Sequence, residues 1–109
     1  MTLRRGEVVL IGIDFHQTPG GKVRPAVVSL DCGDDDFVAA PITSRPRLSD
    51  FDLPIQQWRD AGLNTASTIR VHKLTVLAKD EILRRLGELA GPDRTALAAA
   101  LSRAFAPGQ

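Results

Sequence analysis

Residues 20–30 read GGKVRPAVVSL, a glycine-rich loop that continues directly into an apolar segment. Arg24 and Pro25 stand at the junction. Because proline has no amide hydrogen to give to a strand ladder, it is found at the first residue of a strand or at a sheet edge. The pattern therefore predicts a strand over residues 24–30. Pro25 fixes the backbone at the start of this strand, and Arg24 is held there beside it.

Other short segments rich in apolar and β-branched residues predict further strands. The segments between them contain the glycine, proline, serine and aspartate that favour turns. One helical turn is expected over residues 79–83, ahead of the segment 85–89. The expected strands cover residues 8–13, 24–30, 37–43 and 68–77, with a shorter one at 51–55 and an irregular segment at 58–65.

The last segment has the pattern of a helix. Gly91-Pro92-Asp93 is typical of a helix start, with proline near the first position and an acid in the first turn. Leu97, Leu101 and Phe105 then recur every four residues and form an apolar stripe. Many short strands followed by one helix predict an α+β, mostly β fold: a small curled β-barrel with a C-terminal α-helix, in a single domain over residues 1–109.

Composition and charge narrow the class of protein. Hydrophobic residues make up 43% of the chain and charged residues 25%, which is typical of a globular domain rather than a disordered one. The net charge is only +1, so a surface that binds anions would need local clustering of the 14 basic residues. The one cysteine, Cys32, favours a reducing compartment. With no signal peptide and no long apolar run, we expect a cytosolic protein without membrane contact.

The hairpin formed by residues 24–30 and 37–43 allows a geometric prediction. If its turn is centred between Gly33 and Asp34, residues equally far from that point face each other, and Arg24 lies opposite Thr43. Opposed residues of antiparallel strands project on one face, with Cβ atoms about 5 Å apart. A bulge at Pro41 or a turn displaced by half a residue would break this pairing. Two interpretations stay open: a joint anion site, or a surface arginine beside a strand-ending threonine, which the residues alone favour.

A second cluster follows from the alternation in residues 68–77. Ile69 and Val71 fall on one face, and Thr68, Arg70 and His72 on the other. A face that carries arginine and histidine is not expected in a core. With Arg45, Arg47 and Lys73 it forms either a basic patch for phosphates or an ordinary solvated face.

Metal and cofactor sites are poorly supported. The carboxylates of residues 34–36 are consecutive in a turn and diverge, and Cys32 has no second thiol for zinc. The sequence contains no glycine-rich phosphate loop of the P-loop or Rossmann type. His16 lies in a loop, where it is either simply exposed or a proton carrier.

The succession of these segments resembles the MazF/PemK family of bacterial toxins over residues 5–105. The matching motifs are RRGEVVLIGID, GGKVRPAVV, DDFVAAPITSRP, DLPIQQWRDAGLNTASTIRVHKLTVL and LGEL, followed by the terminal helix. The resemblance implies an SH3-like barrel, a homodimer and a cognate antitoxin as partner. It also implies a sequence-selective endoribonuclease that cleaves single-stranded RNA without a metal, by attack of the 2′-hydroxyl on the adjacent phosphate.

The resemblance also implies roles for individual residues. Arg24 matches the catalytic arginine of the Arg-Pro motif, and Thr43 matches the catalytic threonine at the end of the third strand. Arg70 matches a basic position that serves catalysis in some members. His72 stands where several relatives carry an acid, so either His72 takes the role of the base itself or Arg24 acts alone with Thr43. The expected RNA contacts are His16, Gln17, Thr18 and Lys22 in the first loop, with Ser44, Arg45 and Lys73 along the same groove.

Two other functions compete with the ribonuclease. One is a non-catalytic relative that keeps the dimer and binds RNA or an antitoxin-like protein without cleavage. The other is an adaptor of the SH3 type. Such an adaptor needs a cluster of exposed aromatic residues, and one tryptophan, four phenylalanines and no tyrosine do not easily supply it.

Overall fold

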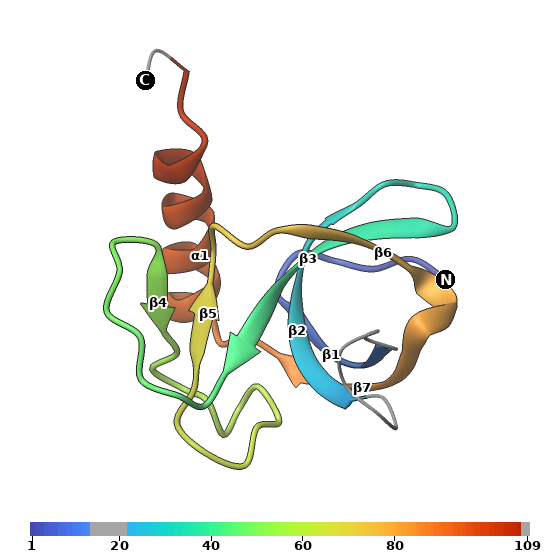
Figure 1. The fold of residues 1–109 in the computed structure, drawn as a ribbon, viewed down its shortest axis with the longest axis horizontal. Coiled ribbons are helices and arrows are strands. Elements are labelled where there is room, and N and C mark those ends of the chain that lie inside the picture. Colours follow the sequence, from blue (N-terminus) through green and yellow to red (C-terminus); the bar gives the residue numbers. More distant parts are fainter. Residues whose placement is uncertain (14–21, 108–109) are drawn as a thin grey trace.

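The computed structural model describes residues 1–13 and 22–107 as a curled antiparallel sheet with one α-helix beside it (Figure 1). His16, Gln17 and Thr18 lie outside the described residues. The strands are β1 (Glu7–Ile13), β2 (Lys22–Asp31), β3 (Asp36–Thr43), β4 (Asp52–Pro54), β5 (Thr68–Arg70), β6 (Thr75–Ala78) and β7 (Ile82–Glu88); η1 (Lys79–Glu81) is a single 3-10 turn, and α1 spans Gly91–Ala104.

The sheet has the strand order β4-β5-β3-β2-β1-β7, and β6 pairs with β3 beside this path. Every pairing is antiparallel. The prediction of a mostly β protein with a C-terminal helix is confirmed. The strand pairings among the described residues do not close the sheet into a barrel. None of the helices in the described part of the chain has the length and apolar character of a membrane span.

The prediction of one strand over residues 68–77 is wrong, because the structure has two strands there, β5 and β6. β5 pairs with the end of β3 at Ile42 and Thr43, whereas β6 pairs with its beginning at residues 36–39. Between them the chain turns, and the amide of Lys73 donates to the carbonyl of Arg70 at 3.0 Å. Pro41 lies in the unpaired middle of β3 on this side, and proline has no amide hydrogen to offer a neighbouring strand.

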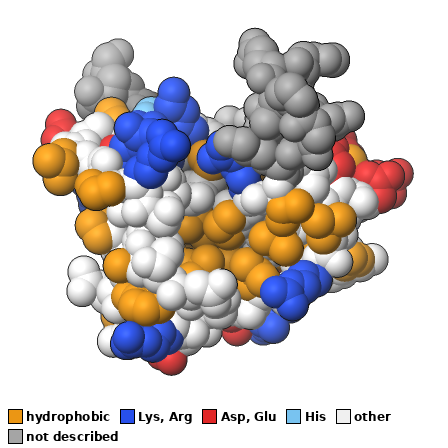
Figure 2. Space-filling view, turned by 60° about the horizontal axis from the view of Figure 1, so that its bottom comes forward, with side chains coloured by type: hydrophobic (Ala, Val, Ile, Leu, Met, Phe, Trp, Pro, Cys, Tyr) orange, Lys and Arg blue, Asp and Glu red, His pale blue; other side chains and the backbone are white. Residues whose placement is uncertain are grey.

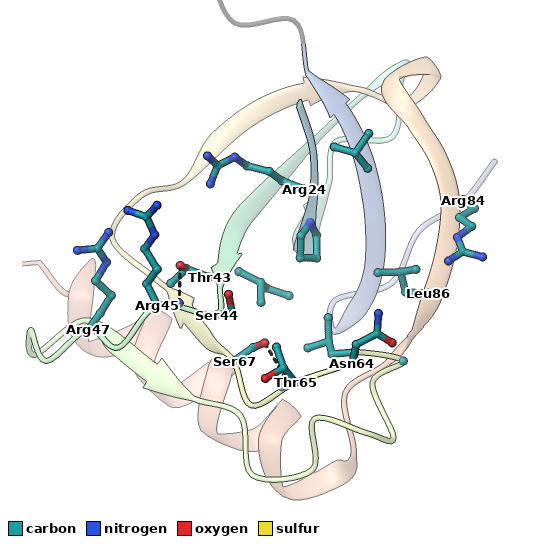
Figure 3. Close-up of a pocket in the computed structure, with 15 residues that line it drawn as sticks. Arg24, Thr43, Ser44, Arg45, Arg47, Asn64, Thr65, Ser67, Arg84 and Leu86 are labelled. Atoms are coloured by element: carbon teal, nitrogen blue, oxygen red, sulfur yellow. Dashed lines mark hydrogen bonds between the residues drawn. The ribbon is translucent and has the colours of Figure 1, made fainter. Parts of the chain in front are cut away.

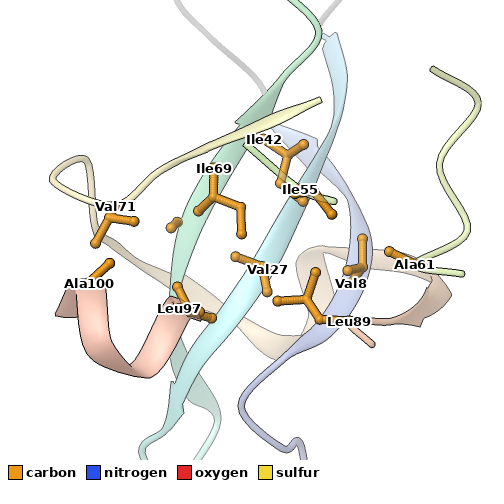
Figure 4. Close-up of a cluster of buried hydrophobic side chains, with 11 residues drawn as sticks. Val8, Val27, Ile42, Ile55, Ala61, Ile69, Val71, Leu89, Leu97 and Ala100 are labelled. Atoms are coloured by element: carbon orange, nitrogen blue, oxygen red, sulfur yellow. The ribbon is translucent and has the colours of Figure 1, made fainter. Parts of the chain in front are cut away.

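The core forms two clusters, one under the helix and one inside the curl of the sheet. Under α1, Leu97 and Ala100 face Val27, Ile69 and Val71 (Figure 4). The second cluster contains Val9, Ile11, Val28, Phe37 and Leu77. The predicted stripe of α1 continues to Leu101, which packs against the first cluster, but Phe105 is 57% exposed.

The acid in the first turn of α1 has a structural role beyond the helix end. Asp93 is buried, and its two carboxylate oxygens accept the backbone amides of Gln56 and Gln57 at 2.9 and 2.8 Å. Hydrogen bonds to a charged acceptor are about twice as strong as neutral ones. Asp93 therefore fixes the segment that follows β4 against the start of the helix.

Candidate functional site

The register of the β2–β3 hairpin places Arg24 and Thr43 at the same end of the sheet. Ala26 pairs with Pro41 and Val27 with Ala40. If this register is extended by two residues along both strands, Arg24 falls opposite Thr43, which is the arrangement expected from the sequence. The open end of the hairpin therefore carries a guanidinium and a hydroxyl on neighbouring strands.

A β-bulge at Ser29 preserves this register. Near the turn, Asp31 pairs with Phe37, so the turn is displaced by half a residue from the predicted centre. The register shifts between Val28 and Leu30, where Ser29 is the additional residue. The buried Ser29 hydroxyl donates to the carbonyl of Val38 at 3.1 Å, and the Ser29 carbonyl accepts Nε of Arg5 at 2.9 Å. The hydroxyl and the carbonyl of the bulged residue therefore both have hydrogen-bond partners. The additional residue offsets the displacement of the turn, so the register beyond the bulge is the predicted one.

Arg24 and Thr43 line a cavity of about 650 Å³, which we call the arginine groove (Figure 3). None of the described residues that line it is acidic. Figure 2 shows apolar side chains gathered on one face of the molecule with basic side chains around them. The lining consists of four arginines (Arg24, Arg45, Arg47 and Arg84), five polar residues (Thr43, Ser44, Asn64, Thr65 and Ser67) and Val23, Pro25, Ile42, Gly62, Leu63 and Leu86.

The charged groups of the groove are arranged on two sides. Arg24, Arg45 and Arg47 extend their guanidinium groups on one side of the cavity, and Arg84 of β7 lies on the other (Figure 3). All four arginines are exposed. Guanidinium groups bind phosphate oxygens through paired, parallel hydrogen bonds. The groove therefore has the charge and the donors to hold a polyanion such as a nucleic-acid backbone.

Thr43 is held in place by the residues that follow it. Its Oγ1 accepts the backbone amide of Arg45 at 3.1 Å. A hydroxyl has one donor and two acceptor positions, so this bond leaves its hydrogen to be donated elsewhere. Thr43 consequently fixes the turn that carries Ser44 and Arg45, and it presents a donor at the wall of the groove.

The opposite wall comes from the irregular segment before β5. Gly62 has a φ of +84° and lies directly against β7. The contact is so close that a Cβ at this position would overlap the carbonyl oxygen of Leu86, so the position requires glycine. A Cβ at Gly87 would in turn lie 2.6 Å from the carbonyl oxygen of Ala61. This backbone-to-backbone packing positions residues 63–65 at the groove, where the hydroxyl of Ser67 donates to the carbonyl of Thr65 at 2.9 Å.

Arg70 and His72 do not line the arginine groove. Nε of Arg70 forms an ion pair with Oδ1 of Asp52 at 3.0 Å, and the Asp52 side chain is only 1% exposed. Burial opposes the ionisation of Asp52. The hydrogen bonds from Ser49 and the Arg70 guanidinium outweigh that penalty and hold the pKa of the carboxyl below its usual range.

His72 packs beside Phe51, with ring centroids 5.7 Å apart. Its Nδ1 is buried and has no hydrogen-bond partner among the described residues. Lys73 lines a different, apolar cavity. The basic patch predicted from the sequence is therefore divided: Arg45 and Arg47 line the groove, and Arg70, His72 and Lys73 do not.

Several residues of the groove were not anticipated. Arg84 lies between the predicted helical turn over residues 79–83 and the segment 85–89. Asn64, Thr65 and Ser67 belong to a stretch in which apolar residues do not recur at regular intervals. The two glycines that bring the chain together here, Gly62 and Gly87, are far apart in the sequence. The two glycines are the feature from which this wall could have been inferred, because a close contact between two backbones requires residues without a side chain.

Over residues 1–13 and 22–107, no group of three histidine, cysteine, aspartate or glutamate side chains is placed to hold a metal ion. Asp31, the last residue of β2, has a structural role. Asp31 accepts the amides of Leu3 and Gly33, each at 2.8 Å, and forms an ion pair with Lys79 at 2.9 Å. The bond from Leu3, the ammonium of Lys79 and the bond from Gly33 together hold the pKa of Asp31 well below its usual range.

Comparisons with known proteins point to one family. The sequence model of the family of PemK-like, MazF-like toxins of type II toxin-antitoxin systems matches residues 4–105. Among curated proteins, none matches this chain.

Several solved structures share the fold. A mycobacterial endoribonuclease in complex with its cognate antitoxin is 20% identical, with a TM-score of 0.78 and 99% of each chain covered. Toxin MazF-mt6 of Mycobacterium tuberculosis is 23% identical, with a TM-score of 0.73, covering 94% of this chain and 99% of its own. A MazE-MazF structure from Deinococcus radiodurans is 18% identical, with a TM-score of 0.73 and coverage of 93% and 94%.

Proposed function

Because the chain belongs to the family of PemK-like, MazF-like toxins of type II toxin-antitoxin systems, whose members are endoribonucleases, we propose that it is a metal-independent, sequence-selective endoribonuclease. Its substrate is single-stranded mRNA. The observation that supports this proposal most directly is the arginine groove, in which Arg24 and Thr43 line one cavity with three further arginines and no acid among the described lining residues.

The proposed reaction is an attack of the 2′-hydroxyl on the adjacent phosphorus. The 2′-hydroxyl gives up its proton as it attacks, the bond from phosphorus to the 5′-oxygen of the next nucleotide breaks, and that oxygen takes up a proton, which gives a 2′,3′-cyclic phosphate and a 5′-hydroxyl end. The five-coordinate phosphorus carries additional negative charge on its oxygens. Cationic donors already aimed at that charge contribute most to such a reaction, because they need no reorganisation.

Arg24 is the residue we assign to that charge. Its guanidinium stays protonated at any physiological pH, so it stabilises the phosphorane as a cation and donor rather than as a base. Thr43 donates its hydroxyl hydrogen to a phosphate oxygen and orients the linkage for attack. Pro25 supports both roles, since it fixes the strand entrance next to Arg24.

The base remains a choice between two proposals. In the first, Arg24 and Thr43 act without a histidine, and solvent water takes the 2′-hydroxyl proton and protonates the 5′-oxygen; the common place of the two residues in the groove supports this proposal. In the second, His72 takes the proton of the 2′-hydroxyl, and Arg70 assists as a neighbouring cation. The second proposal requires the substrate to reach beyond the groove, because neither residue lines it.

The proposed RNA contacts follow the rim of the groove. Ser44, Arg45 and Arg47 extend beyond Thr43, and Asn64 and Thr65 face them from the opposite wall. Few aromatic side chains are present in the chain, so sequence readout depends on polar groups rather than on stacking. His16, Gln17, Thr18 and Lys22 of the first loop, and Lys73, complete the proposed contacts.

The remaining features of the family are proposals for this chain. They comprise closure of the sheet as an SH3-like barrel, one domain over residues 1–109, a homodimer, neutralisation by a cognate antitoxin and a cytoplasmic location. The antitoxin proposal is supported by the likeness to a toxin chain solved in complex with its cognate antitoxin.

Cleavage of a long single-stranded RNA in EDTA tests the proposal. The purified protein should produce discrete fragments that end in 2′,3′-cyclic phosphate, and sequencing of the fragment ends should give one recognition motif. RNA that is bound but stays intact would support the non-catalytic relative instead. Uniform degradation that EDTA abolishes would contradict the metal-independent mechanism.

A pH profile decides between the two proposals for the base. If His72 is the base, the rate should fall as the solution is acidified, because a protonated imidazole cannot accept the proton of the 2′-hydroxyl. The His72→Gln variant should then lose both the activity and this slope. An unchanged profile in His72→Gln leaves Arg24 and Thr43 as the catalytic pair.

A further inference from the structure

A second cavity, of about 370 Å³, adjoins the arginine groove. This volume falls within the range of about 300–1,000 Å³ that is typical of small-molecule sites. Its walls are mainly apolar and come from Ile11, Ala26, Ala39 and Leu77, on four different strands, with Pro25 and Pro41. Arg24, Lys73 and Thr75 are the polar side chains among the described residues that line it.

The two cavities share part of one wall. Arg24 and Pro25 line both of them. A guanidinium thus stands between a cationic polar groove and an apolar cavity. A nucleotide has the complementary composition, because a charged phosphate is linked through the ribose to a base with flat apolar faces.

We propose that this cavity receives one nucleobase of the RNA substrate while the neighbouring phosphate lies in the arginine groove. We call the cavity the base pocket; its assignment rests on the function proposed above. The charged side chains of its lining, Arg24 and Lys73, are both cationic, which suits a polyanionic ligand. Its aliphatic walls bury the faces of a base without the aromatic residues that other RNA-binding surfaces use.

The polar atoms of the lining also favour particular bases. The side chains of Lys73 and Arg24 only donate hydrogen bonds, and the hydroxyl of Thr75 can donate or accept one. Uracil presents a carbonyl oxygen at the position where cytosine presents an amino group, and guanine differs from adenine in the same way. The base pocket should therefore prefer uracil or guanine to cytosine or adenine.

Two neighbouring residues of β6 provide a matched pair of variants. Thr75 lines the base pocket, whereas Val76, the next residue, points to the other face of the strand and is 65% exposed. The Thr75→Phe variant fills the pocket, and Val76→Phe adds the same side chain outside it. Phenylalanine is well accommodated in strands, so both variants should fold, which equal thermal midpoints would verify.

The assay measures the binding of uncleavable 2′-O-methyl oligonucleotides by fluorescence anisotropy. A uridine strand is compared with a strand of equal length that contains abasic sites, which has the same phosphates. The wild-type protein and Val76→Phe should both favour the uridine strand. In Thr75→Phe this preference should be lost, because the phenylalanine side chain occupies the space that the base would fill.

A second variant tests the choice of base. In Lys73→Met, the preference for uridine and guanosine strands over cytidine and adenosine strands should decrease, while the preference over abasic strands stays. If Thr75→Phe retains the full preference for bases, the pocket has another occupant, such as a side chain of a protein partner, and the inference is overturned. If the wild-type protein neither binds nor cleaves RNA, the proposed function fails, and the base pocket fails with it.

Discussion

The arginine groove and the β4–β5 region both place arginine near the end of a strand, but they use it in opposite ways. In the β4–β5 region, Arg70 is mostly buried and pairs with Asp52 at 3.0 Å. In the groove, Arg45, Arg47 and Arg84 are exposed, and none of the three forms an ion pair within residues 1–13 and 22–107. The difference indicates which region is structural and which one is suited to an external anion.

The physical reason is the placement of the carboxylates. A buried carboxylate needs a partner, so Arg70 is required by Asp52 and serves the fold. The groove has no carboxylate among its described lining residues, and four arginines line it. Like charges gathered in a cleft repel one another, and a bound polyanion relieves that repulsion while it gains contacts.

The largest effect is expected for Arg24→Ala. Loss of a single donor to the charge that develops in a transition state lowers the rate by about 10²–10³-fold. The cleavage rate per folded molecule on single-stranded RNA should decrease by that factor. Arg103→Ala, which removes an exposed arginine from α1, is the matched control and should cleave at the wild-type rate. Equal activity of the two variants would remove Arg24 from the mechanism.

The reverse result is expected for Arg70→Ala. This variant leaves the Asp52 carboxylate without its cation, and loss of such a hydrogen bond to a charged group costs about 1.5–3 kcal/mol of folding free energy. Denaturant unfolding measures the cost directly. The cleavage rate per folded molecule should remain close to that of the wild type. A stable Arg70→Ala protein with greatly reduced cleavage would show that Arg70 is catalytic and would break the distinction between the two regions.

Acid should reduce the difference between the wild type and Asp52→Asn. The folded-state pKa of Asp52 is held below its unfolded value, so its ionised form adds stability above about pH 4. This contribution is lost as the pH falls through the folded-state pKa. The gap in unfolding free energy between the two proteins should therefore narrow on acidification below about pH 4. Asp60→Asn, at an exposed position, controls for the loss of one negative charge, and a constant gap for Asp52→Asn would contradict the pairing.

The smallest effect concerns salt. For single strands, the logarithm of affinity falls with the logarithm of salt concentration by about 0.7 for each neutralised phosphate. Arg47→Ala should lower this slope by about that amount and weaken RNA binding evenly across sequences. Arg103→Ala should leave the slope unchanged. Identical slopes for both variants would place Arg47 outside the RNA path.

Much of the hairpin was predictable, because alternation and turn composition fix its register locally. The bulge at Ser29 was not, since it depends on the carbonyl of Val38 and on the side chain of Arg5. The division of residues 68–77 was missed for a similar reason. The two strands arise because β3 pairs with β5 at its end and with β6 at its beginning. The β-branched composition of residues 68–77 does not show that its pairing partner is divided in this way.

The candidate site was predictable on one side only. Arg24, Thr43, Ser44 and Arg45 lie on or directly after the hairpin, so their proximity followed from its register. The opposite wall depends on the packing of Gly62 against β7, a contact between segments that are distant in the sequence. The separation of Arg70 from the groove depends in the same way on a partner, Asp52, that lies on another strand.

The central claim is that RNA binds in the arginine groove and not over the β4–β5 region. The most direct test follows backbone amide signals by NMR during titration with an uncleavable 2′-O-methyl oligonucleotide. We expect the signals of Thr43, Ser44 and Thr65 to shift and those of Asp52 and Arg70 to stay in place. Shifts confined to Asp52, Arg70 and their neighbours, with an unperturbed groove, would contradict the claim.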